Sequence, residues 1–156
     1  MGEYFHYANL DRRELFDVGL GVYNDKRSGI GRNLGARALG LLLKEQAPAG
    51  GLPGSWAGQR VMVVGDETPN GLYETARADY RDIASAVLLM LFADDREEII
   101  EAAVTNDSLF VHLAELAVVH GADTVAGALA AHFGAEWRKK YGLLRKQMHY
   151  LVIPPP

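Results

Sequence analysis

A glycine-rich segment ahead of a helical pattern is the first place where this sequence could bind an anion. Gly29, Gly31 and Gly35 surround Arg32 where the helical periodicity begins. Backbone N–H groups at a helix N-terminus bind phosphate, and an arginine adds a bidentate donor. The spacing G-x-G-x-x-x-G misses the dinucleotide fingerprint by one residue, and it lacks the Gly-Lys-Ser/Thr of a P-loop. Two interpretations stay open: a phosphate site, and an entry turn whose glycines allow close helix packing.

Two acidic residues follow the most strand-like segment of the chain. Residues 60–66 are β-branched and nearly all apolar, as expected for a strand covered on both faces, and Asp66 and Glu67 stand at its end. Paired carboxylates at a strand end can hold Mg²⁺. A third ligand would have to come from elsewhere, for example from Asp94 or Asp95. The alternative is a simple Gly-Asp turn, since both residue types favour turns.

The histidines offer a third candidate. His112 and Glu115 are three residues apart on one predicted helix face, as in carboxylate-rich metal bundles, and His120 lies at the end of the same helix. A single His–Glu pair supplies too few ligands for a metal, so a polar stripe of a surface helix is the alternative. His6 and His149 would meet only if the terminal strands pair. No serine lies in a G-x-S-x-G motif.

The fourth candidate is a basic amphipathic helix over residues 135–147. Aromatic residues mark one face, and basic residues occupy the others; the set is Trp137, Arg138, Lys139, Lys140, Tyr141, Arg145 and Lys146. Such a helix can meet nucleic acid, a membrane surface or an acidic partner. The same pattern describes a terminal helix that docks through its aromatic face on an acidic body. The net charge of the whole chain is −4, so the remainder of the chain is acidic.

Composition limits the kinds of site that are possible. The chain has 156 residues, 49% hydrophobic and 23% charged, which suits one globular domain. It has no cysteine, which excludes disulfides, thiolate zinc sites and cysteine nucleophiles and fits a reducing compartment. The longest apolar run, residues 86–93, is far shorter than the roughly 20 residues of a membrane span. We therefore expect a soluble, cytoplasmic protein, with no secretory signal at its start.

The helices and strands that must position these residues lie in two segments of different composition. Residues 1–73 are rich in glycine and aromatics and predict a β-hairpin over residues 4–18, a helix over 33–46 and the strand over 60–66. Residues 74–134 predict successive helices, and the first of them, from residue 74 to about 92, is expected to be long and largely buried. The basic helix and a tail with a candidate strand over 149–153 complete the chain.

Helices and strands do not alternate regularly along this order. We therefore predict an α+β fold: a small mixed or antiparallel sheet packed on five or six helices, within a single domain.

Two segments carry a resemblance to known proteins. The segments Tyr7–Glu14 and Trp56–Asp66 resemble a group of proteins from actinobacteria, other bacteria and phages. That group pairs an opening of the form aromatic, Asn-Leu-Asp, basic with a strand of the form Trp-Ala-Gly, Arg, apolar run, Gly-Asp. The resemblance covers about the first 70 residues and implies a bacterial or phage origin. It also implies that the hairpin and the strand over 60–66 belong to one unit, and it carries over no activity and no site residue.

The sequence assembles no catalytic set, and aromatic residues that could anchor an interface are plentiful. Our first expectation is a non-enzymatic binding or accessory protein that acts through protein contacts, possibly as a homo-oligomer, without a cofactor. The first alternative is a small enzyme that binds a nucleotide or phosphate through the segment 29–35. The second is nucleic-acid binding through the basic helix.

Overall fold

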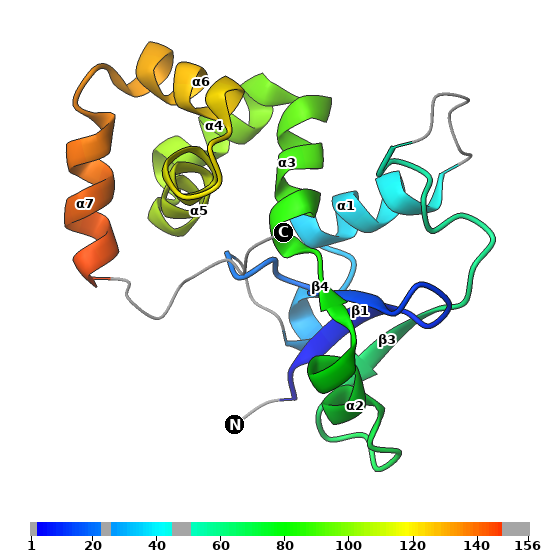
Figure 1. The fold of residues 1–156 in the computed structure, drawn as a ribbon. Helices are drawn as coiled ribbons and strands as arrows, with labels where there is room; N and C mark the ends of the chain where they lie inside the picture. The colour runs from blue at the N-terminus through cyan, green and yellow to red at the C-terminus, as the bar shows by residue number, and fades with distance from the viewer. Residues whose placement is uncertain (1–2, 23–25, 45–50, 148–156) are drawn as a thin grey trace. The chain divides into compact units, whose positions relative to one another are not determined.

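The computed structural model describes residues 3–22, 26–44 and 51–147 of the chain (Figure 1). The chain folds into two compact units, residues 1–90 (unit 1) and residues 91–155 (unit 2), and the division falls inside a helix. The helices and a small four-stranded mixed sheet confirm the α+β class. The single domain expected from the length stays a prediction. The expected strand over 149–153 lies outside the described residues.

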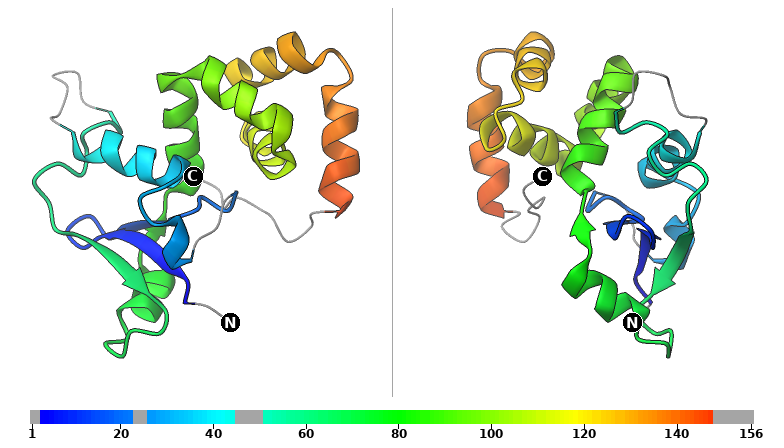
Figure 2. Two further views of the ribbon diagram at one scale, coloured as in Figure 1. Left: turned by 180° about the vertical axis from the view of Figure 1, so that it is seen from behind. Right: turned by 45° about the vertical axis from the view of Figure 1, so that its right-hand side comes forward.

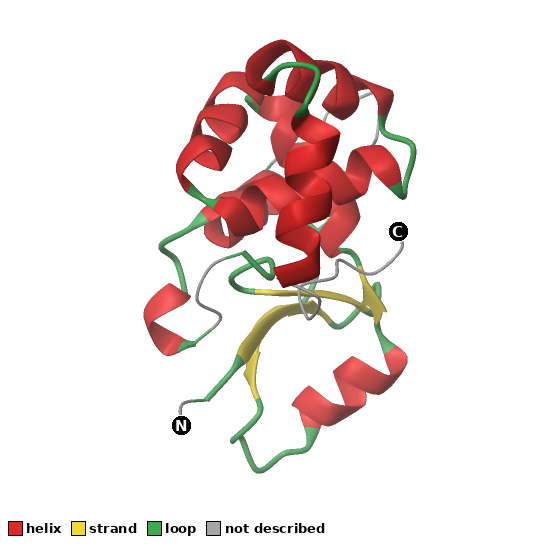
Figure 3. Ribbon diagram, turned by 90° about the vertical axis from the view of Figure 1, so that its left-hand side faces the viewer, coloured by secondary structure: helices red, strands yellow, loops and turns green. Residues whose placement is uncertain are grey.

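The sheet lies in unit 1, with the strand order β3-β1-β2-β4 (Figures 1 and 3). Its strands are β1 (Phe5–Asn9), β2 (Glu14–Asp17), β3 (Val61–Gly65) and β4 (Arg81–Asp82). β1 runs antiparallel to β2 and to β3, and the short β4 runs parallel to β2. The hairpin and the strand over residues 60–66 are therefore confirmed, and both belong to one sheet, as expected.

The side chain of Asn9 builds the turn between β1 and β2. Its Oδ1 accepts hydrogen bonds from the backbone N–H groups of Asp11, at 3.0 Å, and Arg12, at 2.8 Å. Such side-chain bonds to the following backbone explain why asparagine is common in turns. The turn fixes a register in which His6 lies opposite Asp17. A polar pair therefore faces one side of the sheet near the far end of the hairpin.

β3 is an edge strand, and the expectation that it is covered on both faces is wrong. Met62 and Val63 are each 42% exposed, whereas Val64 and Gly65 are buried. An apolar β-branched run predicts a strand correctly, but it does not tell a central strand from an edge strand. The place of β3 in the sheet depends on which strands pair, and the tertiary structure decides this.

The helices of unit 1 are η1 (Arg27–Gly29), α1 (Leu34–Leu43), α2 (Leu72–Asp79) and the first part of α3 (Ala84–Asp94). We expected one helical stretch from residue 74 to 92, and that expectation is wrong, because β4 separates α2 from α3 (Figure 2). The N–H groups of Arg81 and Ile83 donate to the carbonyls of Arg13 and Leu15, both at 2.9 Å. Bonding to β2 thus replaces helical bonding, and the described residues form seven α-helices rather than five or six.

The two faces of the sheet have different partners. On one face the rings of Tyr7, Phe16 and Trp56 follow one another, with centroids 5.4 and 5.6 Å apart. On the other face α2 contributes Tyr73 and Ala76 to an apolar cluster with the strands. The remaining members of that cluster are Ala8, Leu15 and Val64. The side chains of His6 and Asp17 belong to this second face, since they alternate with their neighbours along β1 and β2.

Unit 2 is helical, and α5 is its buried centre. Its helices are α4 (Arg96–Thr105), α5 (Asp107–Val118), α6 (Asp123–Phe133) and α7 (Trp137–Gln147). Every residue of α5 from Leu109 to Ala117 is buried, and α4, α6 and α7 all contact it. Asp95 and Asn106 cap α4 and α5 by accepting from backbone N–H groups, as their positions in the sequence predict. Among the described residues, each helix is too short or too polar to cross a bilayer.

Candidate functional site

The glycine segment uses most of its backbone donors within the chain. The N–H of Gly31 donates to the Tyr7 hydroxyl at 3.1 Å, and that of Gly35 to Asn33 Oδ1 at 2.9 Å. The N–H groups of Gly29 and Arg32 donate to nearby carbonyls. A Cβ on Gly35 would lie 1.9 Å from the carbonyl oxygen of Val18, so this glycine permits a close backbone approach. The geometry gives the segment a packing role, and phosphate binding there stays a prediction.

The two acidic residues that follow β3, Asp66 and Glu67, have different surroundings. Asp66 Oδ1 accepts from the backbone N–H of Tyr4 at 2.9 Å, and Glu67 is exposed. Within the described ranges, no three His, Cys, Asp or Glu side chains are grouped as metal ligands would be. Asp66 does line a cavity, described below, that neither Asp94 nor Asp95 lines.

His112 and Glu115 lie in the core of unit 2. His112 is 2% exposed, and its Nδ1 donates to the carbonyl of Ser108, 2.6 Å away. Burial lowers the pKa of His112, and the bond to Ser108 offsets part of this effect. Glu115 Oε1 accepts from Arg145 Nε at 2.6 Å. Glu115 thus joins α5 to α7, whereas His112 is bonded within α5, and because both side chains are buried the solvated stripe that the spacing suggested is wrong.

One side of α7 docks within unit 2. Trp137 is buried, and Lys140 Nζ lies 4.5 and 4.9 Å from the ring centroids of Phe110 and Phe133. Burial, followed by the charge of Glu115, raises the pKa of Tyr141. The exposed basic residues of this helix are Arg138, Lys139 and Lys146. The basic set that the sequence singles out is thus divided between docking contacts and a solvent-facing side.

The two segments that carry the resemblance are hydrogen-bonded to each other. Three side-chain pairs join them: Asn9–Gln59, Asp11–Arg60 and Glu14–Trp56. Glu14 is 2% exposed and accepts from Trp56 Nε1 at 3.0 Å, from Arg12 Nε at 2.9 Å and from Arg81 Nη2. Burial pushes the pKa of Glu14 up, but these hydrogen bonds outweigh it and hold the pKa below its usual value. Since every one of these groups has a partner, this network stabilises the fold.

A polar cavity lies on the opposite face of the sheet, beside α2. It has a volume of about 600 Å³. β1, β2 and β4 supply His6, Asp17 and Asp82, α2 supplies Arg77, and the end of β3 leads to Asp66. Neighbouring strands carry the first three side chains, because the hairpin register places His6 opposite Asp17 and β4 pairs with β2. The cavity thus brings together three carboxylates, one arginine and one histidine from segments far apart in sequence.

His6 is the unusual group in this cavity. It is 4% exposed, and neither ring nitrogen makes an aligned hydrogen bond to any residue that the structure describes. Nδ1 lies 2.6 Å from Asp17 Oδ1, which is an ion-pair distance, but the direction is wrong for a hydrogen bond. The imidazole stacks on Tyr73 with centroids 4.2 Å apart and planes at 8°. A buried polar group without a proper partner costs about 1–3 kcal/mol, so its presence beside a cavity points to a ligand.

Asp82 has a perturbed environment in the same cavity. Burial raises its pKa first, and the negative charge of Asp17 adds to the effect. A hydrogen bond from the N–H of Ala84 at 2.9 Å and the nearby His6 act in the opposite direction without cancelling it. Carboxyl groups with raised pKa values in clefts are candidates for binding and proton transfer. The Asp17–Asp82 pair therefore concentrates negative charge that the protein leaves partly unneutralised.

Three aromatic rings also line the cavity, and each lies close to a lysine or arginine side chain of the protein. Tyr4, Tyr73 and Tyr80 line the cavity. A cationic group of the protein lies 5.5–5.8 Å from the centroid of each ring; the three pairs are Lys26–Tyr4, Arg77–Tyr73 and Arg13–Tyr80. Acceptor groups and electron-rich rings thus outnumber the donors around this space. The arrangement suits a ligand that carries positive charge and N–H donors.

Sequence reasoning considered His6 only together with His149 and passed over Asp17, Arg77 and Asp82. A signal was present: in a predicted hairpin, His6 and Asp17 interrupt the apolar alternation at positions that pair across the turn. The contributions of α2 and β4 left no such signal, because the pattern over residues 74–92 predicted one helix.

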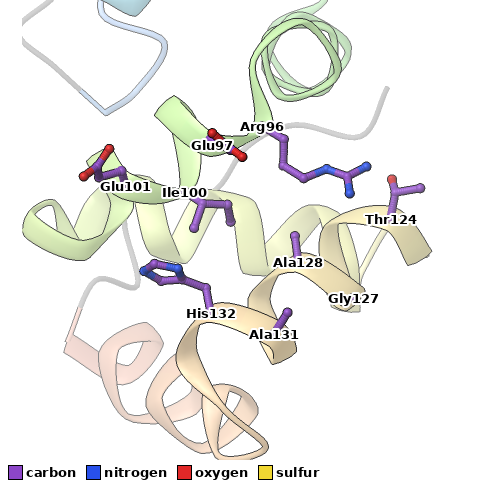
Figure 4. Close-up of a pocket in the computed structure, with 9 residues that line it drawn as sticks. All are labelled: Arg96, Glu97, Ile100, Glu101, Thr124, Gly127, Ala128, Ala131 and His132. Atoms are coloured by element: carbon purple, nitrogen blue, oxygen red, sulfur yellow. The ribbon is translucent and has the colours of Figure 1, made fainter.

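A second cavity of about 630 Å³ lies between α4 and α6 in unit 2 (Figure 4). Ile100 on α4 and Ala128 on α6 form part of its apolar floor, and Arg96, Glu97 and His132 lie around it (Figure 4). Its small side chains make a groove rather than a set of converging polar groups. It contains none of the buried polar atoms that lack a partner among the described residues.

No protein-family model matches the chain, and no curated protein or solved structure matches it either.

Proposed function

We propose that unit 1 binds a small organic cation with a primary ammonium group in the cavity between α2 and the sheet. The observation that carries the proposal is His6, which is buried beside this cavity with no aligned hydrogen bond to a described residue. An unpaired buried imidazole is a cost that a bound donor would remove. The sequence predicts a binding or accessory protein that acts through protein contacts, whereas the ligand that we propose here is a small molecule.

The chemistry of the wall supports an ammonium group. The carboxylates of Asp17, Asp66 and Asp82 can accept hydrogen bonds, a ring nitrogen of His6 can accept one more, and Arg77 is the cationic side chain among the lining residues. An ammonium group has three N–H donors and no acceptor, so it complements such a wall. Aromatic rings with nearby carboxylates are the surroundings in which proteins recognise ammonium ions. An anionic ligand would face three carboxylates and a single guanidinium.

The raised pKa of Asp82 supports the same ligand class. A cation next to Asp82 favours the ionised carboxylate, so binding lowers its pKa and releases a proton wherever the free site is protonated. We therefore expect the affinity for amines to rise with pH through the raised pKa of Asp82 and to level off above it.

Isothermal titration with primary alkylamines tests the proposal. We expect saturable binding that weakens at least about tenfold in Asp17→Asn and His6→Gln, since each removes a hydrogen bond to a charged group. Asp79→Asn is the matched control, because Asp79 lies at the end of α2, is exposed and does not line the cavity. The absence of saturable amine binding, or an equal loss in Asp79→Asn, contradicts the proposal.

The ammonium group could belong to a free amine or to a lysine of a partner protein. Acetylated lysine amide with a free side chain represents the second source, and its form with an acetylated side chain lacks the charge. Binding of the first but not the second, stronger than that of alkylamines, favours a protein partner. Tetramethylammonium, which has no N–H donor, separates hydrogen bonding from attraction to the rings.

A second candidate is an interaction through α7. We infer that Arg138, Lys139 and Lys146 contact an acidic protein or nucleic acid, because these cations stay exposed while the other side of the helix docks. Nucleic-acid binding should fall steeply with salt, since cations on the phosphates are released. A triple alanine variant that binds DNA, RNA and host proteins as well as the wild type does contradicts this second candidate.

We also propose a bacterial or phage origin and a cytoplasmic setting for this activity. The resemblance of the segments Tyr7–Glu14 and Trp56–Asp66 supports the first. A composition without cysteine supports the second, since disulfides are typical of oxidising compartments.

A further inference from the structure

β3 is an edge strand whose outward backbone groups lack partners among the described residues. The Leu10 N–H donates to the Arg60 carbonyl at 2.9 Å, and the Asp66 N–H donates to the Tyr4 carbonyl at 3.0 Å. In an antiparallel pair, residues that bond to the partner alternate with residues whose N–H and C=O groups face away. The backbone groups of Val61 and Val63 therefore face away from β1, at the free edge of the sheet.

The edge lacks the usual protection against pairing. Edge strands are normally blunted by a charge, a proline or a bulge. β3 reads Val-Met-Val-Val-Gly, with none of these inside it, and Met62 and Val63 are each 42% exposed. Its two ends carry opposite charges, since Arg60 precedes the strand and Asp66 follows it. An antiparallel strand of the same sequence would bring each basic end toward the acidic end of its partner.

We propose that two copies of this chain pair through β3, antiparallel and about a two-fold axis at Met62. This interface goes beyond the ligand site and does not depend on it. In this register Val61 of each copy lies opposite Val63 of the other, and the two residues exchange N–H···O bonds. The four outward backbone groups of Val61 and Val63 in each copy are then satisfied. Met62 meets Met62 of the second copy. Arg60, whose guanidinium also pairs with Asp11 of its own copy at 2.7 Å, lies diagonal to Asp66 of the second copy, within reach of a long side chain.

The register avoids an obstacle at the end of β3. The Gly65 carbonyl also faces outward, but it accepts from the Thr68 N–H at 3.3 Å. A register centred on Val63 would need this carbonyl for pairing, whereas a register centred on Met62 leaves the turn intact. Five-residue edges bury a modest area, so we expect a dimer that dissociates on dilution.

Sedimentation equilibrium of the full chain tests the pairing. We expect a monomer–dimer equilibrium in the wild type and an at least tenfold larger dissociation constant for Val63→Pro, which removes the outward N–H from both copies. Proline is tolerated where a strand N–H faces solvent, so the fold should persist, and circular dichroism checks this. Val63→Thr keeps the N–H and the branched side chain and should dimerise like the wild type. A wild type that stays monomeric at every concentration overturns the proposal.

Cross-linking tests the register without a proline. The chain has no cysteine, so a single Met62→Cys substitution places one thiol in each copy. Directly opposed residues of a non-hydrogen-bonded pair have Cα atoms about 4.5 Å apart, within the range of a disulfide. Met62→Cys should form a disulfide dimer on mild oxidation faster than Val63→Cys, whose thiols lie further apart. Equal rates, or faster cross-linking of Val63→Cys, overturn the register and with it the proposed interface.

Discussion

Among the residues that the structure describes, each of the two units buries one histidine, and the two side chains have opposite surroundings. His112 in unit 2 is 2% exposed and donates to the carbonyl of Ser108 in its own helix. His6 in unit 1 is 4% exposed, makes no aligned hydrogen bond to a described residue and faces a cavity of about 600 Å³. Burial alone therefore does not mark a site. A buried group that its own fold leaves unpaired, next to a space for a ligand, is the informative observation.

Three carboxyl groups, two buried and one half-buried, repeat the contrast. Glu14 and Glu115 are both buried and both accept hydrogen bonds from arginine. Asp82 accepts a bond from a backbone N–H, yet burial and the charge of Asp17 raise its pKa. Glu14 and Glu115 therefore join distant segments of the chain, because each is paired with an arginine from another element. Asp82 accepts no hydrogen bond from an arginine among the described residues, and under our proposal the ligand neutralises its charge.

The largest expected effect compares Glu14 with Glu115. Glu14→Ala should lower the free energy of unfolding of unit 1 by about 3 kcal/mol, because it leaves the buried Trp56 N–H unpaired and removes two arginine contacts. Glu115→Ala should cost unit 2 about half as much, since Arg145 is 28% exposed and can return to water. The chain has two tryptophans, Trp56 in unit 1 and Trp137 in unit 2, so ¹⁹F spectra of fluorotryptophan-labelled protein report each unit during urea unfolding.

Glu14→Gln is the matched control for that experiment. It keeps an acceptor oxygen for Trp56 and should recover part of the loss. If Glu14→Ala and Glu115→Ala lower the free energy of unfolding equally, the network around Glu14 does not stabilise unit 1 more than Glu115 stabilises unit 2.

Replacing each histidine by phenylalanine should have opposite effects. His6→Phe removes an unpaired buried group while keeping the ring on Tyr73, so unit 1 should gain about 1–2 kcal/mol and lose amine binding. His112→Phe removes a satisfied hydrogen bond and should cost unit 2 about 1 kcal/mol with amine binding unchanged. Thermal unfolding and titration of both variants measure this. If both variants are destabilised alike, His6 is a structural residue and the comparison fails.

Asp82→Asn should give a smaller gain in stability. The raised pKa means that the ionised form is disfavoured in the folded state, so removing the charge should stabilise unit 1 by up to about 1 kcal/mol at neutral pH. The amide oxygen can still accept from the Ala84 N–H. Amine binding should weaken at the same time, and the gain should vanish when the pH falls below the ordinary aspartate range. A loss of stability at neutral pH would assign Asp82 to the fold instead.

The smallest effect is the pH dependence of the two units. The pKa of His112 is lowered in the folded state, so the unfolded chain binds its proton more readily, and unit 2 should lose stability as the pH falls below about 6.5. The pKa of Glu14 is also lowered, so unit 1 should lose stability only at more acidic pH, below the usual glutamate value of 4.5. Urea midpoints at several pH values, read from the two fluorotryptophan signals, check this order. His112→Phe should remove the first decline.

Much of the fold follows from local pattern. The hairpin over residues 4–18 and the strand over 60–66 were both predicted, since turn chemistry and periodicity act over a few neighbouring residues. The break between α2 and α3 was not, because the N–H groups of Arg81 and Ile83 bond to a strand about 68 residues earlier. The candidate site was missed for the same reason, as its residues come from both sides of that break.

The sequence by itself determined the α+β class, the segments that become β1, β2, β3 and most helices, and the limits that a cysteine-free composition sets on chemistry. The tertiary structure alone decided that β3 lies at an edge and that His6, Asp17 and Asp82 face one cavity. Hydrophobic periodicity and capping act within one element, and they are legible in a single segment. Strand order and the pairing of buried charges depend on which distant segments meet, and only the packed chain determines that.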